Sequence, residues 1–122
     1  MGDVNGDGIN DFGISASFGD GAAGTDSGES FVVFGADGGL GATLNLSSLD
    51  GTNGFRLEGE TAGDNGGVIG RVGDFNNDGL NDFLVGSPND DTANGANTGN
   101  VQIIFGTTAA QSAVRQLGSF DA

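Results

Sequence analysis

The sequence contains no cysteine and no histidine, and these two absences exclude whole classes of chemistry. Without cysteine there is no disulfide bond, thiolate metal site or cysteine nucleophile. Without histidine the chain lacks the commonest general base and the usual zinc ligand. The nearest spare pair of acids, Glu58 and Glu60, is more simply interpreted as the solvated end of a strand. We therefore expect that the protein is not an enzyme.

Positively charged residues are also scarce. The chain has 3 Lys and Arg in total but 17 Asp and Glu, which gives a formal net charge of −14. Nucleic acids and anionic membrane surfaces attract basic proteins, so neither is an expected partner. No apolar run approaches the roughly 20 residues of a membrane-spanning helix, so no membrane insertion is expected. The N-terminus shows no basic segment followed by an apolar one, the pattern of a secretion signal.

Proline occurs once, and tryptophan and tyrosine are absent, whereas glycine occurs 26 times. So much glycine predicts many tight turns. Phenylalanine and β-branched residues recur in short runs between the glycines, which argues against simple disorder. The absence of tryptophan and tyrosine weakens the case for a sugar-binding surface, because such surfaces favour exposed aromatic rings.

The chain does contain a nine-residue motif, D-x-N-x-D-G-x-x-D, at residues 3–11 and again at residues 74–82. Calcium prefers about six to eight oxygen ligands in a flexible shell. Alternate residues of a tight loop direct side-chain oxygens to one centre, and the glycine allows a sharp turn after the third of them. The following carbonyl and the last Asp would complete the shell. The predicted ligands are Asp3, Asn5, Asp7, the Ile9 carbonyl and Asp11 in one loop, and Asp74, Asn76, Asp78, the Leu80 carbonyl and Asp82 in the other.

The two motifs belong to an internal duplication. A shift of 71 positions, the separation of Asp3 and Asp74, aligns the two halves of the chain without a gap. Phe12 then falls on Phe83, the pair Phe34-Gly35 falls on Phe105-Gly106, and Asp50 falls on Asp121. The agreement of two copies at every ligand position strengthens the prediction of about two calcium ions per chain.

The runs between the glycine-rich loops read as β-strands. They are short, rich in β-branched and aromatic residues, and partly alternating, and no stretch shows sustained helical periodicity. This pattern predicts an all-β antiparallel protein. The expected strands cover residues 12–18, 30–34, 54–59, 68–73, 83–88 and 101–105, whereas residues 38–50 and 109–121 give no clear prediction.

The order of metal loop, strand and glycine turn resembles the FG-GAP repeat. Gly73 to Pro88 looks like the calcium loop of that repeat followed by its strand, with Gly86-Ser87-Pro88 at the "GAP" element and Ile69-Gly70 at "FG". The first copy keeps the metal loop but has Ser15-Ala16-Ser17 in place of "GAP". The resemblance covers essentially the whole chain, in the long bacterial variety of the repeat. The dockerin module shares the loop motif, but it continues each loop into a helix and repeats at a shorter interval.

The resemblance implies β-propeller blades like those of integrin alpha subunits and of bacterial surface and secreted proteins. Residues 1–67 would be one repeat without its first strand, and residues 68–122 a second without its last. Two blades form an incomplete ring, because propellers close with about four to eight. We therefore expect further blades from a longer protein, or self-association into a homo-oligomer or fibre.

The function implied by this resemblance is a calcium-binding structural or adhesion module of an extracellular, secreted or cell-surface protein. The expected source is bacterial. Two alternatives stay open: a propeller that binds a glycan or protein ligand, and the accessory propeller of a secreted hydrolase.

Overall fold

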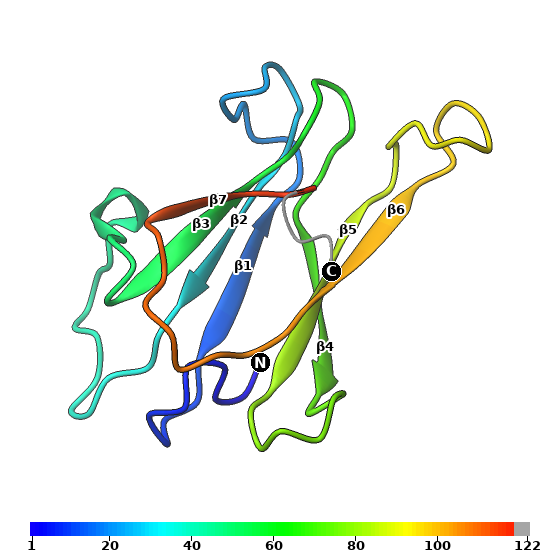
Figure 1. Ribbon diagram of the computed structural model, residues 1–122. Helices are drawn as coiled ribbons and strands as arrows, with labels where there is room; N and C mark the ends of the chain where they lie inside the picture. Colours follow the sequence, from blue (N-terminus) through cyan, green and yellow to red (C-terminus); the bar gives the residue numbers. More distant parts are fainter. Residues whose placement is uncertain (119–122) are drawn as a thin grey trace.

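Seven β-strands in two sheets make up the computed structural model, which describes residues 1–118 (Figure 1). One short 3₁₀ helix, η1 (Leu46–Ser48), interrupts a loop. The strands are β1 (Phe12–Ala16), β2 (Glu29–Val33), β3 (Gly54–Glu58), β4 (Val68–Gly73), β5 (Asp82–Ser87), β6 (Asn100–Ile104) and β7 (Val114–Gln116). Within the described residues no helix is long and apolar enough to cross a membrane.

The first sheet has the strand order β1-β2-β3-β7. Its first three strands pair antiparallel, with Phe12 opposite Val33 and Val32 opposite Phe55. β7 adds to the outer edge of β3 and runs parallel to it. This last pairing joins the two predicted repeats, because β7 lies in the second of them.

The second sheet is antiparallel, with the order β4-β5-β6. Its register places Val85 opposite both Ile69 and Gln102. The pairing shifts between Arg71 and Gly73, where β4 leads into the second motif. An irregularity at this position bends the strand just before the loop begins.

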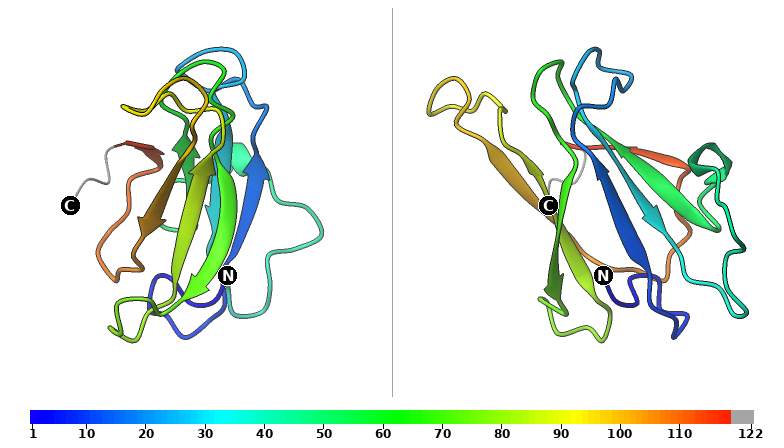
Figure 2. Two further views of the ribbon diagram at one scale, coloured as in Figure 1. Left: turned by 90° about the vertical axis from the view of Figure 1, so that its right-hand side faces the viewer. Right: turned by 180° about the vertical axis from the view of Figure 1, so that it is seen from behind.

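The two sheets share one hydrophobic core. Their facing sides bury Val32, Phe55 and Leu57 of the first sheet and Phe83, Val85 and Ile104 of the second in one cluster. Strands β1 and β4 are in contact, and Figure 2 shows them side by side with the remaining strands of each sheet beyond them. Alternate residues of each strand therefore point into the space between the sheets, as the period of two requires.

Both motif loops lie at one end of the molecule, and the loops around residues 20, 62 and 95 lie at the other (Figure 1). At that far end the backbone of Gly63 donates a hydrogen bond to the carbonyl of Thr25, and Asn89 donates one to that of Asp64. The strands therefore connect two clusters of loops, one of which carries all the predicted metal ligands.

The prediction of an all-β fold is confirmed, and all six expected strands form within two residues of their predicted ends. β7 was not predicted, and its parallel pairing departs from a wholly antiparallel arrangement. The predicted alignment of Asp50 with Asp121 lies partly outside the described residues, as do the last four residues of the second predicted repeat.

Candidate metal centre

The first loop is shaped by its own side chains. The carboxylate of Asp3 accepts hydrogen bonds from the backbone of Gly6 at 2.6 Å and of Gly8 at 2.8 Å. The Asn5 side-chain oxygen accepts one from Asp7 N at 3.1 Å, and the Asp7 carboxylate accepts one from Ile9 N at 2.8 Å. Such bonds between an Asp or Asn side chain and the backbone a few residues later are local and do not need a partner strand.

The second loop repeats this pattern. The carboxylate of Asp74 accepts from Asp78 N at 3.0 Å and from Gly79 N at 2.8 Å. Asn76 accepts from Asp78 N at 3.3 Å, and Asp78 accepts from Leu80 N at 2.9 Å. The two copies of the motif therefore share three side-chain-to-backbone bonds and differ in one, since Asp3 also accepts from Gly6, three residues later, and Asp74 from Asp78, four residues later.

The glycine after the third Asp is required by conformation and not by space. Gly8 has φ +85° and Gly79 has φ +91°, and no atom lies within 4 Å of where a Cβ would stand on either. Backbone in this left-handed region is easy for glycine and strained for most other residues. The glycine predicted from the motif therefore turns the loop as expected.

The second and third side chains of each motif are held next to each other. The Asn5 amide nitrogen donates to Asp7 Oδ2 at 3.0 Å, and the Asn76 amide nitrogen donates to Asp78 Oδ2 at 3.0 Å. Asp7 and Asp78 are exposed at the surface of the loops. Each loop thus presents several oxygens at one solvent-facing turn, which is the kind of ligand that calcium prefers.

The last Asp of each motif lies in a different environment. Asp11 and Asp82 are buried, with 3% and 0% of their surface exposed. One oxygen of Asp11 accepts from Val4 N and the other from Gly35 N, both at 2.8 Å. Each of these two Asp residues therefore closes its motif from inside the protein, and its assignment as a metal ligand stays a prediction.

Asp82 forms the equivalent bonds in the second repeat. It accepts from Phe75 N at 2.7 Å and from Gly106 N at 2.8 Å. Both Asp82 and Asp11 thus join the start of the metal loop to the glycine of a Phe-Gly pair. Sequence reasoning missed this role of Gly35 and Gly106, although each follows its Asp by the same 24 residues.

Burial raises the pKa of the Asp11 carboxyl, against the lowering effect of its hydrogen bonds from Val4 and Gly35. The negative charges of Asp7 and Asp3 raise this pKa further. The first loop therefore brings carboxylates together at a cost in repulsion that a bound cation would relieve.

The first loop also contacts the second repeat. The carbonyl of Asp3 accepts a 2.8 Å hydrogen bond from Asn81 N, and the carbonyl of Val4 accepts a 2.9 Å bond from Thr107 N. Val4 itself is buried in the core between the sheets. Anything that orders the first loop therefore also orders the junction between the two sheets.

Across residues 1–118, no group of three or more acidic side chains is placed to hold a metal ion by itself. The donor set still suits calcium, because each loop combines two acidic side chains with an amide oxygen, and calcium also accepts amide and carbonyl oxygens. Ile9 and Leu80, whose carbonyls are the predicted fourth ligands, follow the turn glycines and donate their N–H groups to Asp7 and Asp78. The residues present thus fit a hard cation held by carboxylate, amide and carbonyl oxygens together.

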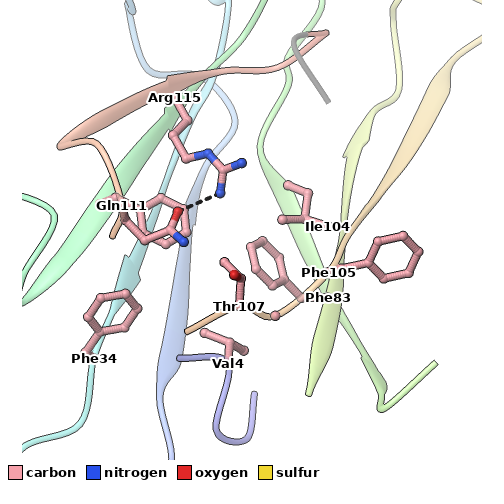
Figure 3. A pocket seen from close by; sticks show the side chains of 10 residues that line it. Val4, Phe34, Phe83, Ile104, Phe105, Thr107, Gln111 and Arg115 are labelled. Carbon is pink, nitrogen blue, oxygen red and sulfur yellow. Dashed lines mark hydrogen bonds between the residues drawn. The ribbon is translucent and has the colours of Figure 1, made fainter. Parts of the chain in front are cut away.

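A small cavity lies between the sheets, close to the first loop (Figure 3). Val4, Phe83 and Ile104 line it, and Arg115 reaches into it from β7 with its guanidinium 5.5 Å from the centre of the Phe55 ring. The Arg115 side chain also donates a 2.8 Å hydrogen bond to Gln111. The free space is about 10 Å³, which is room for about one water molecule and not for an organic ligand.

Residues 61–104 match the family model of the FG-GAP repeat. The matched segment contains β4, the second metal loop, β5 and β6. The FG-GAP repeat is a β-propeller blade, so the predicted family resemblance is confirmed over residues 61–104 and the all-β, blade-type fold class with it, whereas the incomplete ring stays a prediction. A search of curated proteins finds no match for this chain.

Proposed function

We propose that this chain, whose residues 61–104 match the FG-GAP repeat, is a calcium-stabilised propeller module of an extracellular or cell-surface protein. The observation that carries the proposal is the pair of loops at one end of the molecule. Asp3 and Asp74, which stand 71 residues apart, each begin a loop by accepting a hydrogen bond from the turn glycine five residues later, Gly8 and Gly79. A duplicated donor set in a duplicated conformation is more than a chance cluster of acids.

The residues that would hold calcium are those predicted from the motif. Asp3, Asn5 and Asp7 would supply side-chain oxygens in the first loop, with the Ile9 carbonyl and Asp11 completing the set. Asp74, Asn76, Asp78, the Leu80 carbonyl and Asp82 would do so in the second. When bound, calcium would supply positive charge to each group of carboxylates and cross-link the residues of its loop.

The role proposed for the metal is structural. The second loop joins β4 to β5, so fixing it holds two strands in register. The first loop is bonded to Asn81 and Thr107 of the second repeat, so fixing it also holds the two sheets together. Because the unfolded chain has no preformed site, binding free energy adds directly to folding free energy.

A structural role without catalysis agrees with the environment of Glu58, one of the two spare acids. The expectation that Glu58 lies at a solvated strand end is wrong: Glu58 is buried, and its carboxylate pairs with Arg56 at 2.7 Å and accepts a 2.7 Å hydrogen bond from Gln116. A carboxylate so engaged in the sheet is poorly placed for acid–base chemistry. We therefore propose adhesion or structural support, together with further blades or copies of the chain, and not an enzymatic activity.

One observation favours glycan binding as a second candidate. A shallow hollow of about 260 Å³ lies beside Asn5 of the first loop. Hydroxyl and amide side chains line it together with the Phe34 ring, and none of the lining side chains within residues 1–118 is charged. Neutral hydroxyl groups of a sugar would suit such a lining. Calcium-dependent retention on a glycan array would favour this candidate. Loss of that retention in Thr108→Val would place the glycan-binding site at this hollow.

The main experiment measures thermal unfolding with millimolar calcium and with excess chelator. Calcium at 100 times its dissociation constant would stabilise the fold by about 2.7 kcal/mol for each site. We expect a clear rise in Tm with calcium that chelator reverses. The matched control is Asp37→Asn, which removes an exposed acid outside both loops and should respond to calcium like the unmodified chain. If neither calcium nor chelator changes the Tm, the proposal is wrong.

A further inference from the structure

The outer face of the second sheet is apolar and uncovered. Register places Leu84 opposite Ile103 and Gly86 opposite Val101, on the side that points away from the first sheet. Phe105 continues this face beyond the end of β6. Val101, Ile103 and Phe105 are 62%, 38% and 50% exposed. Contiguous apolar surface of this kind is unusual on a monomer and marks a contact surface.

The internal duplication allows this face to be compared with the equivalent face of the first sheet. The 71-residue shift maps Val101, Ile103 and Phe105 onto Ser30, Val32 and Phe34. These three are only 0%, 0% and 6% exposed, and Val32 and Phe34 belong to the core cluster that the second sheet covers. The exposed face of the second sheet is therefore the repeat of a face that is already buried in the first.

The two motif loops show the same difference in burial between the repeats. Val4 is 4% exposed and packs in the core between the sheets, whereas its counterpart Phe75 is 64% exposed. Phe75 thus joins the uncovered surface at its loop end. We define the open face as Phe75, Leu84, Val101, Ile103 and Phe105.

On the outer face of the first sheet, the difference in burial is reversed: a residue of the first repeat is exposed and its counterpart in the second repeat is buried. Phe12 is 40% exposed, but its counterpart Phe83 is 1% exposed in the core. Ile14 lies opposite Phe31 on the same side of the sheet, and both are half-buried. The first sheet therefore leaves partly uncovered the kind of face that the second sheet packs inward: Val33, opposite Phe12 on this side, is 0% exposed, and Arg56, opposite Phe31, adds a charge. We define this complementary face as Phe12, Ile14 and Phe31.

We propose that the open face of one copy of this chain packs against the complementary face of a second copy, repeating between molecules the contact that the two sheets make within one. The occupant is a second copy because the chain itself displays both halves of that contact. The two faces lie on different sheets, so the association is head-to-tail and leaves one face of each kind free at the ends of the assembly. Such a contact closes into a ring or continues as a fibre according to its rotation.

This inference rests on the blade arrangement in the proposed function and not on calcium. The test measures molar mass by sedimentation and light scattering from micromolar to near-millimolar concentration, with calcium and with chelator. Val101→Glu blocks the open face, and Phe12→Glu blocks the complementary face. Phe18→Glu is the matched control, because Phe18 is 76% exposed in the turn after β1 and belongs to neither face.

We expect the mass of the unmodified chain and of Phe18→Glu to rise with concentration past that of a dimer. Each blocked variant alone should stay monomeric. A mixture of the two should stop at a dimer, because one intact face of each kind is available. Circular dichroism of each variant checks that its sheet content is unchanged.

Three outcomes would overturn the inference: an unmodified chain that stays monomeric throughout, a control that dissociates as readily as the blocked variants, or a mixture that stays monomeric while the unmodified chain associates. The first would assign the open face to a further repeat of a longer chain. Association that persists when calcium fails to raise Tm would keep this inference and reject the calcium proposal, so the two fail separately.

Discussion

The fully buried carboxylate of Asp82 accepts a 2.8 Å hydrogen bond from the backbone N–H of Gly106. This one contact joins the end of the second metal loop to the end of β6. Asp11 makes the same contact with Gly35 in the first repeat. The Phe-Gly pair that follows β2 in the first repeat and β6 in the second is thus the anchor of the motif loop.

Asp82→Ala should destabilise the protein by about 3 kcal/mol or more. It removes two short hydrogen bonds to the carboxylate, each worth about 1.5–3 kcal/mol, and a longer 3.4 Å bond from Asn76 N, and it leaves the N–H groups of Phe75 and Gly106 without this acceptor. Urea denaturation in chelator measures the loss apart from any effect on metal binding. Asp37→Asn serves as the exposed control, and a loss below about 1 kcal/mol for Asp82→Ala would contradict the anchoring role.

Asp3→Asn combined with Asp7→Asn should reduce the number of calcium ions bound per chain from about two to about one, because carboxylate charge dominates the affinity of an oxygen site. The equivalent pair in the second loop, Asp74→Asn with Asp78→Asn, should do the same. Isothermal titration calorimetry gives the stoichiometry directly. If either pair leaves it unchanged, the loop in question is not a calcium site.

Gly79→Ala should cost about 1–2 kcal/mol, because alanine must adopt φ +91° there. Gly79→Asn should cost less, since asparagine tolerates this conformation better. Gly86→Ala is the control, because Gly86 lies in β5 and an added Cβ would meet its nearest neighbour at an ordinary 3.7 Å. Chemical denaturation ranks the three variants, and an alanine at position 79 as stable as one at position 86 would contradict the strain argument.

Asp64→Asn should stabilise the protein at neutral pH. Burial, followed by the charge of Asp90 and then that of Asp91, raises the pKa of Asp64 above its ordinary 3.8, outweighing the side-chain and backbone hydrogen bonds from Thr61 that lower it. The folded state therefore binds this proton more tightly than the unfolded state. Its contribution to stability is present below the ordinary value and is lost as pH rises through the folded pKa.

The asparagine side chain in Asp64→Asn cannot ionise, so the variant should be more stable than the unmodified protein at pH 7 and differ little from it at pH 4. Urea denaturation of both proteins at the two pH values, in chelator, measures this difference. Equal stability of the variant and the unmodified protein at pH 7 would contradict the prediction, because it would mean that the ionised Asp64 carboxylate does not destabilise the folded state.

The local features of this protein could be predicted from its sequence. The loops follow from Asp and Asn side chains that bond to backbone two to five residues later, with glycine at the position of positive φ. The strands follow from short β-branched and aromatic runs between glycine turns. The duplication follows from simple alignment, and with it the family resemblance that the match at residues 61–104 confirms.

Contacts between distant residues were decided by the tertiary structure alone. β7 pairs with β3 across 58 residues, as in the contact of Glu58 with Gln116, and its three residues carry no local strand signal. The burial of Asp11 and Asp82 depends on backbone donors 24 residues away, so the motif could not show it.

The sequence by itself determined which residues could bind a metal, where the chain turns and that it consists of two similar halves, because these depend on interactions within a few residues or on the pattern itself. Only the tertiary structure decided which of two equivalent faces is buried. Val32 and Ile103 are both β-branched and occupy the same place in the repeat, yet one is 0% and the other 38% exposed. The difference arises because burial depends on what packs against a residue, and the second sheet covers only the first.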